Sequence, residues 1–533
     1  MKYLFFPLLL VVFWSKMACA QPGSLDSAFG NAGVLFCEKG FPLSISNGPL
    51  YADFNRLVST LDAENKVLVC HSAEYNAGLT LARFLPDGST DAGFGNNGVA
   101  TVDAGAVAQC NFLLTQEDGK ILSAGTVRHD TAGYNTYDFF IVRLLPNGNP
   151  DPGFGNEGKV AIDLGMNEIT QGLALQADGK ILLSGSTGYY DWVIGHTDVV
   201  LLRLLPNGSP DLSFGNAGQV LTNLSWQAWD ADEGGPIAVQ EDGRILVAAK
   251  NGPGYNFEGH FALLCYEASG TLDSTFGVNG VSVEWDTPVP ISTSITLKGD
   301  QTILIAGKGG DVFYGGIFLT LRHYSPDGKI DSSFATNGIY RSQMNDFARI
   351  FTSVQIQSDE KILAAGQDSG RVVLMRFTPN GQPDPSFAVQ GRAVTPLPYL
   401  DIYNSRLFQY PTGKITLVCT SSDTYIDSVD RVLLLRYHTD YSDAVQDPTA
   451  LAGMTVQIVP NPAYDRFAVC AVESVSGWFT LYRADGAPVF REKLESCTRQ
   501  EFSVAAVPAG TYFWKWEPFV KGRARSGKVV VQH

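Results

Sequence analysis

Tyrosine and tryptophan residues alternate with carboxylates and amides in several loop-like segments of the sequence. The two densest segments are 187–198 (TGYYDWVIGHTD) and 225–235 (SWQAWDADEGG). An aromatic side chain stacks on the apolar face of a sugar ring, and carboxylate or amide oxygens accept hydrogen bonds from its hydroxyl groups. This composition favours a glycan-binding surface, although Tyr, Gly and Asn also fill solvated loops that bind nothing. The residues expected to carry binding are Tyr189, Tyr190, Trp192, Trp226 and Trp229.

Histidines and further carboxylates in such segments raise the question of catalysis. His129, His196 and His260 are the histidines concerned, yet no spacing identifies an acid–base pair or a nucleophile triad. The sequence also lacks the G-x-S-x-G, H-E-x-x-H and Walker motifs. A binding or adhesion protein is therefore the first hypothesis. An extracellular carbohydrate-active enzyme, either a hydrolase or a lyase, and a structural surface protein without a small-molecule site are the alternatives.

One acidic stretch has the composition of a cation site. Asp230, Asp232 and Glu233 are followed by glycine, and Ca²⁺ is held in proteins by carboxylate and other oxygen ligands. The stretch lacks the regular alternation and the terminal glutamate of an EF-hand loop. Calcium bound there is the only cofactor that the sequence suggests.

The elements that must position these loops repeat along the chain. An Asp-x-x-Phe motif recurs seven times, at intervals of 53 to 65 residues, and a glycine follows each phenylalanine four residues later. Between successive motifs lie a short strand after a DG-like turn, such as KILSAG, and a closing strand such as IVRLLPNG. The motif phenylalanines are Phe29, Phe94, Phe154, Phe214, Phe276, Phe334 and Phe387.

Each repeat contains about four short strands separated by Gly, Asn, Asp and Pro turns, which is typical of propeller blades. The closing strands contain unbroken apolar runs, for example at 199–202 and 432–435, as expected for sheets buried on both faces. A single blade would expose both of its apolar faces to solvent, and each blade can bury them only against its neighbours. The repeats therefore predict one closed, all-β, seven-bladed propeller over residues 21–440. Whether strands from the two ends share a blade at the point of closure stays open at this stage.

Two recurring residues are interpreted as structural. The motif phenylalanine is expected to pack as a wedge between blades. An arginine in the closing strand stands eight residues before the next aspartate of the motif, as in Arg143 and Asp151, and predicts an ion pair. Cys265 and His323 replace this arginine in two units, which makes the pair optional.

Strand direction predicts where the variable loops lie. Antiparallel strands alternate in direction, so successive connections leave opposite ends of a blade. The tight DG turn and the repeated P-[DN]-G segment share one end. The variable loops, including the aromatic segments, are therefore expected together on the opposite face.

The D-x-x-F-G-x-x-G, x-D-G-K-I-L and L-x-R-x-x-P-[DN]-G units resemble the bacterial delta-60 repeat over about 420 residues. Two units depart from the pattern, with YEASG from Tyr266 and YHTD from Tyr437. The resemblance implies an exported, propeller-like protein and no particular activity.

The N-terminus has the pattern of a signal peptide. An apolar run at 3–14 follows a lysine and is shorter than the roughly 20 residues of a membrane span. The small residues at 18–20 fit a cleavage site, which predicts removal of residues 1–20 between Ala20 and Gln21. No other stretch is long and apolar enough to span a bilayer, so no transmembrane segment is expected.

The cysteines are too few for a disulfide scaffold. Seven remain once Cys19 is removed with the signal peptide. Cys19 would be the acylated residue of a lipoprotein, an alternative that the lysine three positions earlier disfavours. Cys70 and Cys419 occupy equivalent strand positions and are expected to be buried as small hydrophobic residues. Cys470 and Cys497 are the candidate disulfide.

The repeat ends near residue 440, and the polar stretch 441–453 is interpreted as a linker. Residues 454–533 carry ten Lys and Arg against seven Asp and Glu, whereas the whole chain has a net charge of −16. Alternating apolar positions, as in RFAVCAV and TYFWKW, predict a small antiparallel β-sandwich. The acidic balance of the chain argues against nucleic acid as a partner, since phosphate binding needs clustered Lys and Arg.

This C-terminal segment resembles the type A sorting domain of the type IX secretion system. The resemblance rests on VPNP from Val459, the DG turn at 485, PAGTY from Pro508 and KVVV from Lys528. It implies that the secretion machinery recognises residues 454–533 and carries the protein across the outer membrane of a Gram-negative bacterium, and that most of this domain is then removed. The protein would then be released or attached at the cell surface, where an extracellular polysaccharide or protein is the expected partner.

Overall fold

The computed structural model consists of β-strands connected by turns and loops. It describes residues 22–26, 29, 34–37, 58–72, 78–104, 107–131, 134–190, 195–224, 231–252, 260–284, 291–311, 316–342, 348–368, 371–396, 401–409, 414–422, 430–439, 457–459, 466–483, 487–503, 507–508, 510–518 and 525–531. The predicted signal peptide, its cleavage site at Ala20 and Gln21, and the linker 441–453 lie outside these residues. Residues 20–443 form one compact unit and residues 444–533 belong to another. No helix within the described part of the chain is long and apolar enough to cross a membrane.

Seven four-stranded antiparallel sheets make up the larger unit. Blades one to three are β2 (Val58–Leu61), β3 (Val67–Ser72), β4 (Gly78–Phe84), β5 (Val99–Asp103); β6 (Val107–Thr115), β7 (Ile121–Thr131), β8 (Tyr134–Leu144), β9 (Lys159–Ile162); and β10 (Asn167–Leu175), β11 (Ile181–Tyr190), β12 (Gly195–Leu204), β13 (Gln219–Thr222). Blades four and five are β14 (Glu233–Val239), β15 (Ile245–Asn251), β16 (His260–Tyr266), β17 (Val281–Glu284); and β18 (Ile291–Leu297), β19 (Ile303–Asp311), β20 (Gly316–Tyr324), β21 (Ile339–Arg341). Blades six and seven are β22 (Ala348–Ile356), β23 (Ile362–Asp368), β24 (Arg371–Phe377), β25 (Arg392–Pro396); and β26 (Asp401–Gln409), β27 (Ile415–Ser422), β28 (Asp430–Tyr437), β1 (Val34–Cys37).

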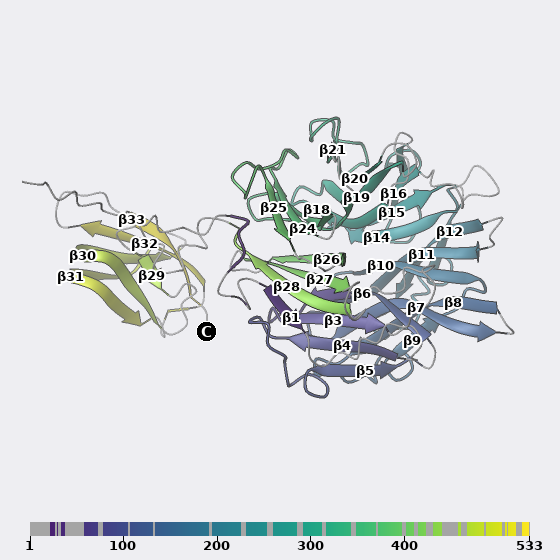
Figure 1. The fold of residues 1–533 in the computed structure, drawn as a ribbon, viewed down its shortest axis with the longest axis horizontal. Coiled ribbons are helices and arrows are strands. Elements are labelled where there is room, and N and C mark those ends of the chain that lie inside the picture. The colour runs from purple at the N-terminus through teal and green to yellow at the C-terminus, as the bar shows by residue number, and fades with distance from the viewer. Residues whose placement is uncertain are drawn as a thin grey trace, which may run out of the picture. The chain divides into compact units, whose positions relative to one another are not determined.

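The sheets are arranged around a common centre, as Figure 1 shows. The first strand of each blade contacts the first strand of the next, in the order β2, β6, β10, β14, β18, β22, β26, and β26 contacts β2 again. Contacts between consecutive first strands that return to their starting point define a closed ring. The all-β, seven-bladed propeller predicted from the sequence is confirmed.

The ring closes through a blade built from both ends of the repeat region. Strand β1, near the N-terminus, pairs antiparallel with β28, with Val34 opposite Leu435 and Cys37 opposite Val432. Backbone hydrogen bonds also join the two ends outside this strand pair. For example, the Asp26 N–H donates to the Arg436 carbonyl at 2.7 Å. The seventh blade therefore takes three strands from the C-terminal end and its outermost strand from the N-terminal end.

The motif phenylalanines hold neighbouring blades together. All seven are at most 3% exposed. A glycine packs against each ring, in five of the seven cases from the P-x-Gly turn of the following blade. Gly208 lies against Phe154 and has φ of 88°, and a Cβ added there would come within 2.9 Å of the ring. Glycine is required at such a turn both for the left-handed backbone and for the close approach. The wedge role expected for the phenylalanine is confirmed.

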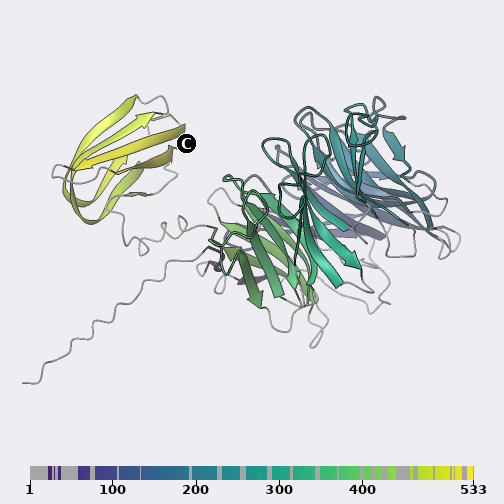
Figure 2. The ribbon, with the colours of Figure 1, turned by 90° about the horizontal axis from the view of Figure 1, so that it is seen from above.

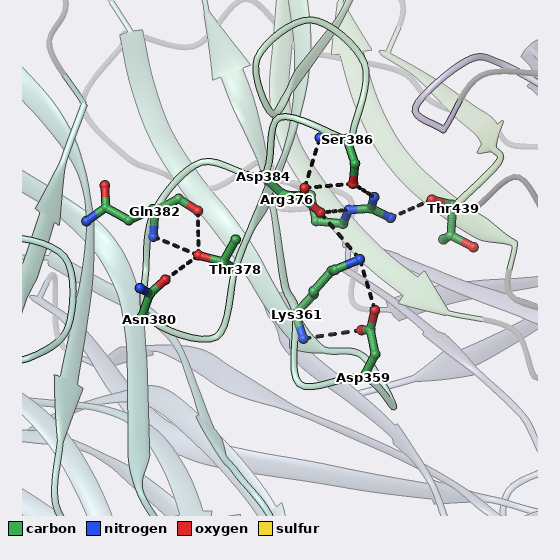
Figure 3. Close-up of polar contacts among 9 residues, drawn as sticks. All are labelled: Asp359, Lys361, Arg376, Thr378, Asn380, Gln382, Asp384, Ser386 and Thr439. Atoms are coloured by element: carbon green, nitrogen blue, oxygen red, sulfur yellow. Dashed lines mark hydrogen bonds and ion pairs between the residues drawn. The ribbon is translucent and has the colours of Figure 1, made fainter.

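The recurring arginine binds both its own blade and the next one. In four blades its Nε donates to the aspartate eight residues later at 2.8 Å, as in Arg376 and Asp384. Figure 3 shows that Arg376 also donates to the Thr439 carbonyl, at 2.5 Å, and that Lys361 reaches Asp384, at 3.5 Å. The guanidinium Cζ lies 4.8 Å from the ring centroid of Phe387. One buried side chain thus joins an ion pair, a carbonyl of the next blade and the phenylalanine wedge.

The two units without this arginine give the aspartate a different partner. His323 Nδ1 lies 3.0 Å from Asp331 Oδ2 in one unit. In the other, Arg244 from the DG-like turn reaches across to Asp273, with Nη1 at 3.1 Å from Oδ2. A positive or hydrogen-bonding partner for the aspartate is therefore retained even where the repeat pattern fails.

The C-terminal unit is a small antiparallel β module. It contains β29 (Gln457–Val459), β30 (Arg466–Arg483), β31 (Pro488–Ser503), β32 (Gly510–Pro518) and β33 (Arg525–Val531). The long β30 shifts register between Cys470 and Val475, so its first half pairs with β29 and its second half with β32. Phe479 of the second half stacks on Phe502, opposite the first half, at 5.3 Å. The two halves thus pack on each other, and the curved strands of this module are visible in Figure 2.

The backbone register places the candidate disulfide on neighbouring strands. Cys470 of β30 is opposite Arg499, two residues from Cys497, and Cys497 of β31 is opposite Val475. The disulfide between Cys470 and Cys497 stays a prediction. Cys70, Cys110, Cys265 and Cys419 are free thiols and are buried.

Candidate functional site

The order of strands places the variable connections on one face of the propeller. In each blade the first and second strands are joined by the DG-like turn, and the third and fourth by the P-[DN]-G and D-x-x-F segment. Because neighbouring strands are antiparallel, these two connections share one face. The connections between second and third strands, and between one blade and the next, lie on the other. The aromatic segments 187–198 and 225–235 belong to these connections.

The structure describes part of the predicted glycan-binding set. Tyr189 and Tyr190 end β11, opposite His196 and Gly195 in the register with β12. Trp192, Trp226, Trp229 and Asp230 lie outside the described residues. Tyr189 and Tyr190 are thus at the variable face of blade three.

The two described members of the predicted calcium site contact protein groups. Asp232 is fully buried, and its Oδ1 accepts a hydrogen bond from Asn251 Nδ2 at 2.8 Å. Its Oδ2 accepts from the Leu224 N–H at 2.6 Å. Glu233 is half-buried, with Oε1 at 3.5 Å from Lys250 Nζ. A calcium ion at this stretch stays a prediction.

A second group of carboxylates lies at the junction between blades two and three. One carboxylate oxygen from each of Asp138, Asp163 and Glu168 lies within 4.8 Å of the other two. Asp138 is in β8, Asp163 follows the end of β9, and Glu168 is in β10. His129 Nε2 lies 3.1 Å from Asp138 Oδ2 at the same junction.

Burial shapes the electrostatics of this group. Burial raises the pKa of Asp138, which is 8% exposed, and the negative charge of Asp163 raises it further. Burial also raises the pKa of Glu168, which is fully buried, and the charge of Asp138 adds to that shift. Such shifts mark carboxyl groups whose ionised form lacks sufficient compensation. A fully buried Glu168 cannot contact a substrate in solution, so this group is not interpreted as an acid–base pair.

An open groove of about 580 Å³ adjoins the carboxylates. Its polar lining comes from Asp163, Thr187, His196, Asp198 and Gln219. Its apolar lining includes Met166 and Leu221, which are 40% and 53% exposed. The groove thus combines exposed apolar surface with hydrogen-bonding side chains, and it lies next to the strand that carries Tyr189.

Sequence reasoning found part of this site and missed the rest. His196 was among the candidate histidines, and its Nε2 lies 3.9 Å from Asp198 Oδ1. Asp138, Asp163 and Glu168 were not singled out. The signal was in the repeat: Asp138 and Asp198 both stand five residues before the recurring arginine. Superimposing the units by that arginine would have identified the position.

Comparison with protein families supports the repeat. The model of a β-propeller domain of unknown function (DUF5122) matches at residues 116–154, 176–214, 240–276 and 357–387. Each stretch runs from a DG-like turn to a motif phenylalanine. The chain is a propeller repeat protein. A search of curated proteins gives no match to this sequence.

Several solved structures are similar to this chain at low sequence identity. The polysaccharide lyase Uly1 is 11% identical, with a TM-score of 0.45 over 75% of this chain and 93% of the lyase. PorZ, a bacterial surface component of the type IX secretion system of Porphyromonas gingivalis, is 11% identical, with a TM-score of 0.30 over 90% of this chain and 74% of PorZ. The NanB sialidase of Streptococcus pneumoniae is 10% identical, with a TM-score of 0.37 over 75% of this chain and 70% of the sialidase.

Proposed function

We propose that this propeller repeat protein is an exported binding or adhesion protein whose ligand is an extracellular polysaccharide. The observation that carries the proposal is the groove beside blade three. It joins apolar surface to acceptor and donor groups within one open depression, which is the combination that a pyranose ring requires. A protein ligand in the same groove is the alternative partner.

The polar and apolar residues of the groove would contact different parts of a sugar. Asp163 and Asp198 would accept hydrogen bonds from vicinal hydroxyls, and His196 and Gln219 would donate or accept according to the sugar. Met166 and Leu221 would cover the apolar face of a ring. The aromatic segment that begins with Tyr189 at the end of β11 would extend the surface along a chain of sugars.

Asp198→Ala combined with His196→Ala is expected to weaken glycan binding at least about tenfold, since each lost charged or strong hydrogen bond contributes about 1 kcal/mol or more. A glycan array identifies the ligand, and titration calorimetry of wild type and variant measures the change. The thermal midpoint should stay nearly unchanged because the His196 side chain is exposed and that of Asp198 is half-buried. Trp192→Ala with Trp226→Ala is expected to weaken binding by a similar factor.

The control is Lys329→Ala, which removes a side chain that is 79% exposed in the turn segment of blade five, outside the groove. Equal binding by wild type and the Asp198/His196 variant would remove the groove from the proposal. Turnover of a bound glycan into shorter products would favour the carbohydrate-active enzyme. If neither binding nor turnover of a glycan is detected, the structural surface protein is favoured.

We also propose that the chain reaches the cell surface through both of its ends. Residues 1–20 would direct passage across the inner membrane, and residues 454–533 would be recognised by the type IX secretion machinery. The support is the sequence pattern of each end, together with a C-terminal β module that forms a unit of its own. The Ca²⁺ site suggested at Asp230, Asp232 and Glu233 is not needed for this route.

Deleting residues 454–533 is expected to abolish the extracellular form and leave the chain in the periplasm. Fractionation with immunodetection measures this, and intact mass of the secreted wild type should correspond to a chain that starts at Gln21 and lacks most of 454–533. Deletion of the linker 441–453 alone serves as the control for shortening. Unchanged secretion of the chain without 454–533 would contradict the sorting role.

A further inference from the structure

Two neighbouring blade junctions have the same architecture and differ in charge. In β8 and β12 an aspartate stands five residues before the recurring arginine, at Asp138 and Asp198. The fourth strand ends beside it, and the next residue is Asp163 in one junction and Asn223 in the other. The beginning of the following blade then contributes a buried acid.

That buried acid is the second residue of β10 in one junction and directly precedes β14 in the other. Glu168 is opposite Thr187 in the β10–β11 pair, and Thr187 Oγ1 donates to its Oε1 at 2.8 Å. Asp232 stands one position beyond the Glu233–Lys250 pair, and Asn251 Nδ2 donates to its Oδ1 at 2.8 Å. Each acid is 0% exposed. The two junctions can therefore be compared group by group.

The junction between blades three and four satisfies its charges internally. Asn223 Nδ2 donates to Asp198 Oδ1 at 2.8 Å, so an amide dipole lies beside that carboxylate. The second oxygen of Asp232 accepts the Leu224 N–H at 2.6 Å. Both oxygens of the buried acid are thus bonded, and only two of the three positions carry a negative charge.

The junction between blades two and three differs in its charge and in the contacts of its buried acid. Asp163 takes the place of the amide and brings a third negative charge within 4.8 Å of the other two. The Met166 N–H donates to Glu168 Oε1 at 3.1 Å, the same oxygen that accepts from Thr187. The Leu164 N–H, which corresponds to that of Leu224, also interacts with the Glu168 carboxylate and lowers its pKa. Within the described part of the chain, Glu168 Oε2 is buried and accepts no hydrogen bond. A buried polar atom without a partner is rare in native proteins and calls for an ion, a water or a functional role.

We propose that one divalent cation, Ca²⁺, binds between Asp138, Asp163 and Glu168 and balances the additional negative charge that Asp163 brings where the next junction has Asn223. Three carboxylates supply hard oxygen ligands with a formal charge of −3, which suits a divalent ion. Oxygens bound to Ca²⁺ at about 2.3–2.6 Å lie at most about 5.2 Å apart, so a separation within 4.8 Å fits one coordination shell. Asp163 is exposed and leaves the site open to ions and water from solution.

The ion would join two blades, since Asp138 and Asp163 belong to blade two and Glu168 to blade three. It would also fix Asp163, which lines the groove. The inference does not rest on carbohydrate binding, because it follows from the carboxylates and the unbonded oxygen alone.

Calcium titration of the metal-free full-length chain tests the proposal. In wild type, CaCl₂ at 100 times the dissociation constant should raise the thermal midpoint by about 2–4 °C over the same protein in EDTA. Asp163→Asn reproduces the amide of the next junction and should weaken calcium binding at least about tenfold, as should Glu168→Gln, because each removes one of three charged ligands. In EDTA, Asp163→Asn should be at least as stable as wild type because the repulsion is relieved.

The matched control is Asp103→Asn, at the corresponding position of the junction between blades one and two. At this junction Gly78, opposite Asp103, stands at the position of Asp138, and Ala108 stands at the position of Glu168. Asp103 is therefore the only carboxylate at the three corresponding positions. This variant should respond to calcium as wild type does. Because Asp163 is exposed, Asp163→Asn tests the site even if Glu168→Gln does not fold. A wild-type midpoint that CaCl₂ leaves unchanged, or a response of Asp163→Asn equal to that of wild type, would overturn the proposal.

Discussion

Replacing Phe214 by alanine should lower the free energy of unfolding by about 3–5 kcal/mol. Phe214 is fully buried among apolar residues of blades three and four, including Val199 and Leu264. The Arg203 Cζ lies 4.3 Å from the ring centroid, so the substitution also removes the surface on which the buried guanidinium rests. The Gly270 turn packs against the same ring, and a cavity would open where these groups meet. Urea unfolding followed by circular dichroism measures the change.

Leu212→Ala provides the control for this substitution. Leu212 lies two residues before Phe214 in the same motif segment, but it is 75% exposed. Its replacement should change the free energy of unfolding by no more than about 0.5 kcal/mol. A loss below about 1 kcal/mol for Phe214→Ala would mean that the blades can collapse around the missing ring, and that the wedge is not a main source of stability.

A chain that begins at Glu38 should be far less stable than one that begins at Gln21. The shorter chain loses β1, the buried Phe29 and the contact between Asp26 Oδ2 and Lys414 Nζ at 2.7 Å. Loss of Phe29 alone should cost about 3–5 kcal/mol, and the unpaired edge of β28 adds to this. We expect a thermal midpoint at least about 10 °C lower, or a protein that elutes as aggregates in gel filtration. The chain that begins at Gln21 serves as the control, and equal midpoints for the two would show that β1 is dispensable.

The repeat could be predicted from the sequence because its chemistry is local. Phenylalanine, the following glycine and the P-[DN]-G turn recur at similar distances, and each needs its residue type for a steric reason. Closure could not be predicted, because a cyclic repeat has the same pattern wherever the first blade is taken to begin. The substitution of Arg244 for the missing arginine beside Asp273 could not be predicted either, since the two residues belong to different turns of the blade.

The candidate site was harder to predict because its residues meet only across a blade junction. Asp163 and Glu168 are close in sequence, but Asp138 reaches them only through the pairing of β8 with β9, where Phe139 is opposite Ile162. Glu168 stands in a half-apolar strand, where nothing in the local pattern marks it as functional. Conversely, Asp232 was prominent in an acidic stretch, yet its oxygens contact Asn251 and Leu224. Composition identified a carboxylate-rich face but not which carboxylates meet at one blade junction.

The shared seventh blade has a consequence for how the chain folds. Val34 pairs with Leu435, although nearly the whole repeat region separates them in the sequence. Contacts between residues so distant in sequence form slowly. Six blades can assemble in chain order, but the seventh needs the first strand and the last three together. Until then the edge of β28, with Val432 and Leu434 among its residues, has open backbone groups that another chain can pair with. Closure of the seventh blade is therefore the folding step at which misassembly is easiest. A chaperone that covers the edge of β28, or an N-terminal segment that is free to pair with it, would help most at this step.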